Sequence, residues 1–328
     1  MKKLFISLFA VAALAACTKS EVAYEAPNEI GFAPVTGNVT KATGTSGNLK
    51  TDQELGVWAY WDKDGAVETQ ISDFTKYNDN YLVNALFVSK SATSWGAPAS
   101  NSYPWPVNGS LVFAGYTTPG NEPLGTDAVS YVLADDKMTF TAYENKNEFD
   151  LCWFGRTPAS YNNKSDGSAV TVKLAHALSW VSVAVYGEGN TIGNWTIKSI
   201  ELGNVITKGT ATCKAKTATW SSLETKTMSI YNDSHKLTAG KTENGKTTGT
   251  KLSDNVLIPS KGVTLTVNYE FLVNGVAKSD SKELTLNKDA CWESGKHYTY
   301  TLVFKSNEIL VAPSYDDWGT SDQTVTVE

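Results

Sequence analysis

The sequence predicts an all-β protein made of two β-sandwich domains in tandem. Threonine supplies 38 of the 328 residues and aromatic residues a further 11%, and β-branched and aromatic side chains are enriched in strands. Alternating segments follow one another from residue 55 onwards, and no segment keeps a convincing helical period over ten residues. Asn274-Gly275 separates two alternating segments, which is the strongest short-range signal for a β-hairpin.

The chain begins with a segment typical of bacterial lipoprotein export. Two lysines precede an apolar stretch, residues 4–13, that is too short to span a bilayer. Leu14-Ala15-Ala16-Cys17 follows and resembles a lipobox, so we predict that residues 1–16 are a lipoprotein signal peptide and that Cys17 is lipidated. The alternative is an ordinary signal peptide beside an incidental cysteine. No later segment is apolar over 18 residues.

Residues 17–50 are expected to hold a tether, a first strand and an exposed loop. The tether, residues 18–29, is polar. Ile30 and Phe32 share one face of the short apolar strand that follows. The loop is rich in glycine, threonine and serine.

Residues 51–168 are expected to form the first sandwich domain. Aromatic and β-branched composition favours strands at residues 55–61, 66–71, 111–116, 131–133, 138–143 and 148–154. Asp62-Lys63-Asp64-Gly65 is predicted to be the turn between the first two of these strands. The same four residues resemble the start of an EF-hand loop, but the third ligand and the later glutamate are not in place, so no calcium site is predicted.

Residues 169–328 are expected to form the second sandwich domain, with residues 306–328 as its last strands. The boundary is placed near residue 168 because residues 157–169 are dominated by turn formers and contain few apolar side chains. The strands expected beyond it are residues 170–174, 180–186, 195–202, 213–220, 263–273, 276–286 and 298–304.

The composition leaves little material for catalysis or for nucleic-acid binding. The net charge is −6, and Arg156 is the single arginine. The three histidines, His176, His235 and His297, lack the spacing of metal ligands, and His176 is expected to be structural. No nucleophile-elbow, zinc-peptidase or nucleotide-binding motif occurs. We therefore predict that the protein is not an enzyme and that it holds neither a metal nor a cofactor.

Two groups of residues leave alternatives open. Cys152, Cys213 and Cys291 are an odd number of thiols for an exported protein, so one disulfide at most can form, and buried free thiols are the simpler interpretation. Trp95 and Trp105 lie in a stretch rich in proline, serine and glycine. These two aromatic side chains either plug the end of a sandwich or form an exposed platform for sugar rings.

An eight-residue echo links the two ends of the mature chain. Residues 28–35 (NEIGFAPV) match residues 307–314 (NEILVAPS) at five of eight positions. The apolar positions also agree in parity: Ile30 and Phe32 correspond to Ile309 and Val311. If the first strand were removed, the last strand of a neighbouring copy could replace it, and such head-to-tail exchange builds open filaments. The alternatives are coincidence, or two edge strands that each end at a proline.

The order and combination of several segments resemble the fimbrillin family, the pilin subunits of type V pili in Bacteroidia-type bacteria. The resemblance spans almost the whole mature chain. The segments that carry it are the lipobox ending in Cys17, Ile30-Gly31-Phe32, Thr40-Lys41-Ala42, residues 174–179 (LAHALS), residues 292–302 (WESGKHYTYTL), and Ile309 and Val311 followed by Trp318.

The resemblance implies two transthyretin-like β-sandwich domains and a structural subunit of an adhesive surface fimbria. Such subunits reach the outer membrane surface as lipoproteins, which here implies a lipid on Cys17. Loss of the first strand opens a groove, and the C-terminal strands of another subunit fill it. The implied partners are copies of the chain or related pilins, head to tail, the outer membrane, and a glycan or protein ligand on host or microbial surfaces.

The resemblance also implies a cut after a basic residue in the loop that follows the first strand. By position, Lys41 is the expected site, with Ala42 as the new first residue, and Lys50 is the second choice. The best-known family pattern has arginine there, whereas Arg156 lies inside the first domain, where a cut would destroy it. Either a protease that accepts lysine acts, or the subunit stays uncut and lipidated, as an anchor does.

In the donor segment, Ile309 and Val311 are expected to enter the groove, with Val325 and Val327 on a second strand. Burying four such side chains contributes about 6–12 kcal/mol before ordering costs. The alternative function is that of an outer-membrane lipoprotein that binds surface glycans through the aromatic residues near Trp95 and Trp105.

Overall fold

The structure is a computed structural model that describes residues 28–36, 53–65, 73–118, 120–146, 149–160, 168–287, 290–306, 308–317 and 325–326. Within these residues the regular secondary structure is β-strand, apart from the short 3-10 turns η1 (Phe74–Lys76), η2 (Leu133–Asp135) and η4 (Gly189–Thr191). The all-β prediction is confirmed. No helix in the described part is long and apolar enough to cross a membrane.

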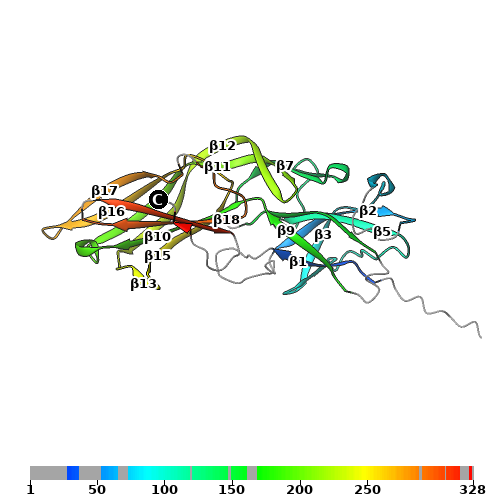
Figure 1. The fold of residues 1–328 in the computed structure, drawn as a ribbon, viewed down its shortest axis with the longest axis horizontal. Helices are drawn as coiled ribbons and strands as arrows, with labels where there is room; N and C mark the ends of the chain where they lie inside the picture. The colour runs from blue at the N-terminus through cyan, green and yellow to red at the C-terminus, as the bar shows by residue number, and fades with distance from the viewer. Residues whose placement is uncertain are drawn as a thin grey trace, which may run out of the picture.

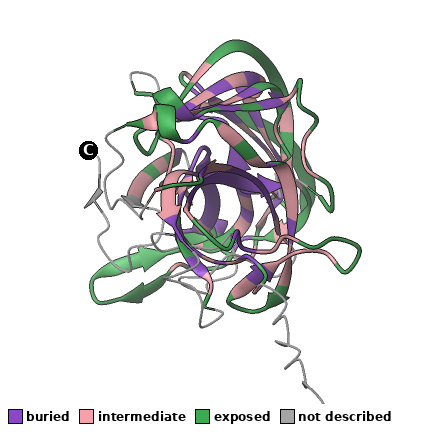
Figure 2. Cartoon of the chain, turned by 90° about the vertical axis from the view of Figure 1, so that its right-hand side faces the viewer, coloured by how far each residue is buried: buried purple, intermediate pink, exposed green. Residues whose placement is uncertain are grey.

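One end of the elongated molecule is a closed β-barrel (Figure 1). Its strands pair in the order β1-β4-β3-β2-β5-β8-β9. Their bounds are β1 (Gly31–Thr36), β2 (Glu54–Asp62), β3 (Asp79–Ser91), β4 (Ser94–Gly96), β5 (Ser110–Thr118), β8 (Cys152–Ala159) and β9 (Val170–His176). Figure 2 looks onto this end, where buried residues line the inside of the ring.

Two sheets with a shared core make up the other end. One sheet has the order β15-β10-β18-β19-β20, and the other has the order β17-β16-β11-β7-β6, with β12 paired to β11. Their strands are β6 (Val129–Val132), β7 (Lys137–Glu144), β10 (Ser179–Gly187), β11 (Trp195–Lys214), β12 (Thr217–Lys236), β15 (Thr250–Leu257), β16 (Thr264–Val273), β17 (Val276–Thr285), β18 (Lys296–Phe304), β19 (Ile309–Asp317) and β20 (Val325–Thr326). Strands β13 (Lys241–Glu243) and β14 (Lys246–Thr248) form a small hairpin. Val183, Leu265 and Phe304 belong to the apolar core that the two large sheets share.

A third apolar core joins the barrel to these sheets. Trp58 and Tyr116 of barrel strands pack in one cluster with Phe140 of β7 and Val256 of β15. Strand β9, which follows the predicted boundary at residue 168, closes the barrel, whereas β6 and β7, which precede it, pair into the sheet of β11. Strand pairing therefore crosses the predicted boundary in both directions.

The turn-rich segment at residues 157–169, on which the boundary near residue 168 was based, begins inside a strand. Residues 157–159 complete β8 and pair with β5. A proline at position 158 is accepted there because it lies near the end of β8, which pairs with β9 only through Cys152 and Trp153. Residues 161–167 lie outside the described residues.

The hairpin signals had mixed outcomes. Asn274 and Gly275 connect β16 to β17 with φ of 52° and 79°, as a type I′ turn requires, so this hairpin is confirmed. The strand predicted at residues 213–220 is wrong at its centre, because Ala215 and Lys216 form the β11–β12 turn with φ of 49° and 67°. Strand β2 ends at Asp62 as expected, but the strand predicted at residues 66–71 lies outside the described residues.

Candidate functional site

The first strand is an integral part of the barrel wall. β1 runs parallel to β9, with five residue pairs from Phe32↔Val170 to Thr36↔Leu174. On its other side it pairs antiparallel with β4 through Gly31↔Gly96 and Phe32↔Trp95. Because β1 and β9 are far apart in the sequence, β1 closes a barrel whose other strands are supplied by later parts of the chain.

One face of the segment formed by Ile30 and β1 points into the barrel core. Ile30 and Phe32 are fully buried, and Pro34 is buried as well. The Phe32 ring meets Phe87 and Phe113 edge to face, with centroids 4.8 and 5.1 Å apart. The shared face predicted for Ile30 and Phe32 is therefore the inward face of the strand.

Polar contacts fix the beginning of this strand. The Ile30 amide donates to the Tyr103 carbonyl at 2.8 Å, and the Trp105 amide donates to the Asn28 carbonyl at 2.9 Å. The Glu29 carboxylate accepts from the Tyr103 amide at 2.6 Å and from the Ser102 hydroxyl at 2.5 Å. The segment before β5 thus holds the entry of β1 in place.

The tryptophans proposed as a sugar platform are part of the barrel core. Trp95 is 1% exposed and Trp105 is 2% exposed. The Trp95 indole donates to the Gln53 carbonyl at 2.7 Å, and the Trp105 ring packs edge to face on Phe113. Of the two alternatives for these residues, the core plug is therefore the one observed: Trp95 lies in β4, and both rings are buried in the barrel interior.

The C-terminal echo has the same inward parity as β1. In β19, which pairs with β18, Ile309 is buried and Val311 is half-buried, while Leu310 between them is 39% exposed. At the start of β1, buried Phe32 and Pro34, together with Ile30 just before the strand, alternate with the less buried Gly31 and Ala33. The backbone of Val325, in β20, pairs with Tyr315 of β19. The side chain of Val325 lies outside the described part of the chain, as do Cys17, Lys41, Ala42, Lys50 and Val327.

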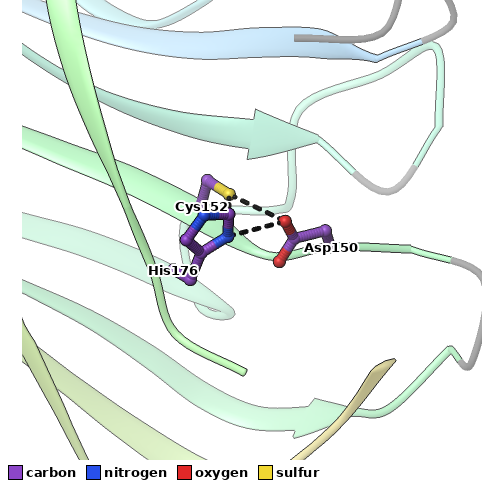
Figure 3. A group of neighbouring side chains, drawn as sticks. All are labelled: Asp150, Cys152 and His176. Atoms are coloured by element: carbon purple, nitrogen blue, oxygen red, sulfur yellow. Dashed lines mark hydrogen bonds and ion pairs between the residues drawn. The ribbon is translucent and has the colours of Figure 1, made fainter. Parts of the chain in front are cut away.

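Apart from β1, the barrel wall holds a second candidate site, which the sequence did not indicate. Three chemically versatile side chains meet there. Figure 3 shows Asp150, Cys152 and His176 converging. The Asp150 Oδ2 atom lies 2.8 Å from His176 Nδ1 and 3.2 Å from Cys152 Sγ, and the sulfur lies 3.3 Å from the same ring nitrogen. All three residues are buried.

Strand pairing brings this group together. Cys152 begins β8 and pairs directly with His176, which ends β9, while Asp150 lies two residues before Cys152. The Thr117 hydroxyl donates to the Asp150 carbonyl at 2.9 Å, and the Cys152 amide donates to the Thr117 oxygen at 2.8 Å. Burial and the neighbouring Asp150 carboxylate raise the pKa of the Cys152 thiol well above its ordinary value. The sulfur is therefore a protonated hydrogen-bond donor rather than a nucleophile.

The other singled-out residues are dispersed. His235 lies in β12 and His297 in β18, and neither belongs to the group around His176. Cys213 is buried and Cys291 exposed, and no disulfide joins the cysteines of the described residues, so the expectation of buried thiols fails for Cys291. The Arg156 guanidinium donates to the Leu133 carbonyl at 2.7 Å and stacks 3.5 Å from the Phe74 ring centre.

Comparison with known proteins identifies related folds and a family. A candidate cell adhesion protein from Bacteroides uniformis ATCC 8492 aligns with a TM-score of 0.54 at 15% identity, over 89% of this chain and 99% of its own. A second, from Bacteroides ovatus ATCC 8483, aligns with a TM-score of 0.50 at 14% identity, over 90% of this chain and 100% of its own. At these identities the likeness concerns the fold alone. No curated protein matches the chain. The fimbrillin-like family model matches residues 40–318, which is most of the sequence, and the chain therefore belongs to the fimbrillin-like family.

Proposed function

We propose that the chain is a structural subunit of a surface fimbria that polymerises by donor-strand exchange after β1 is removed, and that it supports adhesion. Membership of the fimbrillin-like family supports a pilus subunit at the cell surface that assembles with other fimbrial subunits. The subunit is exported as a lipoprotein with Cys17 as the lipid attachment point.

The burial of β1 is the observation that carries this proposal. Removing β1 leaves the parallel partner β9 and the antiparallel partner β4 without a neighbour on one side. It also uncovers the positions that Ile30 and Phe32 fill, and burial of these two side chains contributes about 3–6 kcal/mol. An apolar groove edged by unpaired backbone groups is a template for an incoming strand.

The C-terminal strand of another copy suits that groove. When the echo is aligned, Ile309 takes the place of Ile30 and Val311 that of Phe32, with Leu310 at the position of Gly31. A Cβ atom added at Gly31 would meet its nearest neighbour, the Trp95 carbonyl oxygen, at 3.5 Å, an ordinary contact distance. The groove therefore has room for the first side-chain carbon at that position.

Maturation is proposed at Lys41, which gives a chain that begins at Ala42, with Lys50 as the second site. Cleavage at Arg156 would be destructive, since this residue lies in barrel strand β8. Its guanidinium also donates hydrogen bonds to the Leu133 and Ala134 carbonyls. A chain that stays uncut would keep its lipid and serve as an anchor at the base of the fimbria.

Two experiments test the proposal. N-terminal sequencing of surface-purified protein should give Ala42, whereas an acylated Cys17 would indicate an anchor or an unpolymerised lipoprotein. Deletion of residues 306–328 should abolish ladders of SDS-resistant oligomers. Ladders that persist unchanged in this deletion would rule out the C-terminal strands as donors.

A further inference from the structure

We propose that Asp150, Cys152 and His176 form a binding site for one zinc ion that fastens β8 to β9. The site belongs to the barrel wall rather than to the groove beneath β1, and the inference does not depend on the proposed function. It differs from the sequence-based prediction that the protein holds no metal. No metal-ligand spacing is visible in the sequence, because His176 is separated from the other two residues by most of β8, the following segment and β9.

The three ligand atoms already form a compact triangle with sides of 2.8, 3.2 and 3.3 Å. A tetrahedral zinc ion with bonds of about 2.0–2.3 Å holds its ligand atoms roughly 3.3–3.6 Å apart. The sides therefore need to lengthen by only a few tenths of an ångström. Small side-chain rotations supply that change without moving the two strands.

The donor set and its charge suit a divalent transition metal. A carboxylate oxygen, a thiolate sulfur and an imidazole nitrogen are the ligand types that zinc accepts in proteins. The negative charges of Asp150 and of the Cys152 thiolate together balance the double positive charge of the ion. When the sulfur–zinc bond forms, the S–H bond breaks and its proton passes to solvent.

A second observation also points to an occupant beside this group. The remaining carboxylate oxygen, Asp150 Oδ1, and the Tyr143 hydroxyl are both buried, and neither has a hydrogen-bond partner among the described residues. The Tyr143 hydroxyl is electrostatically coupled to the group, since Asp150 and Cys152 add to the effect of burial in raising its pKa. A water in the fourth coordination position of zinc would supply the hydrogen-bond donor that the Asp150 Oδ1 atom lacks.

The position of the site suggests its role. Strands β8 and β9 pair through only two residue pairs, Cys152↔His176 and Trp153↔Ala175, whereas β9 makes five pairs with β1. Of the two ladders that β9 forms, the one with β8 therefore has fewer residue pairs. A metal bound to Cys152 and His176 crosslinks the two strands at the end of this ladder.

Titration of the full chain with cobalt(II), after dialysis against a chelator, tests the inference. Cobalt bound to a thiolate absorbs in the near ultraviolet, so we expect this band to saturate at one equivalent and to disappear when zinc is added. Cys152→Ser should abolish the band. Cys213→Ser and Cys291→Ser are the matched controls, since they remove a buried and an exposed thiol elsewhere, and both should keep it.

Asp150→Asn provides a second variant that preserves the size of the side chain. With folding checked by circular dichroism, this variant should bind cobalt at least about tenfold more weakly, since even indirect changes at metal sites cost that much. Absence of the band in the wild-type chain, its loss only in Cys291→Ser, or unchanged affinity in folded Asp150→Asn would each overturn the proposal.

Discussion

Replacing Phe32 with alanine should lower the free energy of unfolding by about 3–5 kcal/mol. The ring is fully buried, and it meets Phe87 and Phe113 edge to face inside the barrel. These rings belong to strands on other parts of the barrel wall, so the gap left by the substitution closes only if whole strands move. The cost should therefore lie toward the upper part of the range for large-to-small changes in a core.

Urea unfolding followed by tryptophan fluorescence measures this change, since Trp105 packs on Phe113 next to the substituted ring. Val35→Ala is the matched control, because Val35 lies on the same strand with 38% of its surface exposed, and it should change stability by no more than about 0.5 kcal/mol. A loss below about 1 kcal/mol for Phe32→Ala, or equal losses in both variants, would refute the view that β1 is a core strand.

Three further predictions concern the barrel and the core that joins it to the two sheets. Raising the pH from 10 to 12 should destabilise the wild type more than the Tyr116→Phe variant, and urea melts at alkaline pH would record the difference. Burial raises the pKa of Tyr116 from 10.0 to about 12. The stability that this neutral hydroxyl contributes is therefore complete below pH 10 and is lost as the pH rises through 12. Trp105→Ala should cost about 3–5 kcal/mol in the same urea assay and leave any binding on a glycan array unchanged. Arg156→Ala should cost about 1–3 kcal/mol, because it leaves the Leu133 and Ala134 carbonyls without their charged donor, and thermal melts beside Lys173→Ala would measure it.

Strands with a regular inward face were predictable from the sequence. β16 has buried residues at alternate positions, and Asn274-Gly275 accepts the positive φ values that its turn requires, so both strand and turn were found. Much of β2 and β5 is buried on both faces, and their aromatic and β-branched composition identified them without alternation.

Strands without such a face were missed wholly or for most of their length. β12 is exposed along most of its length, so it carries no apolar alternation to detect. In β3 the alternation is interrupted at Asn84, which has a φ of 49°. Its ladder with β2 shifts register between Val57 and Ala59. Such irregular pairing is set by contacts with the neighbouring strand, which a single sequence does not reveal.

The two candidate sites also differed in how far they could be predicted from the sequence. The echo between residues 28–35 and 307–314 indicated β1, because identical parity can be read from the sequence itself. The group of Asp150, Cys152 and His176 could not be predicted, since it exists only after β8 pairs with β9. The Asp150-x-Cys152 spacing sets two ligand types on one side of an extended chain, but such a pair does not by itself indicate a metal site or the third ligand.

A disulfide between copies tests the central claim, that the C-terminal strand of one copy takes the place of β1 in another. In β1, Val35 pairs with Lys173 of β9, and the echo aligns Ser314 with Val35. Within one chain, Ser314 pairs instead with Thr299 of β18. A bond between positions 173 and 314 therefore reports exchange between chains.

The measurement mixes matured Lys173→Cys and Ser314→Cys chains, both carrying Cys291→Ser, under oxidising conditions and detects the linked pair by mass spectrometry. The account predicts a disulfide between position 173 of one copy and position 314 of the other, since opposed strand residues lie within disulfide reach. Thr171→Cys, two residues along β9, should give little or none. SDS-resistant oligomers that form without the disulfide between positions 173 and 314 would contradict the exchange in this register. An equal disulfide yield from the Thr171→Cys chain would contradict it as well.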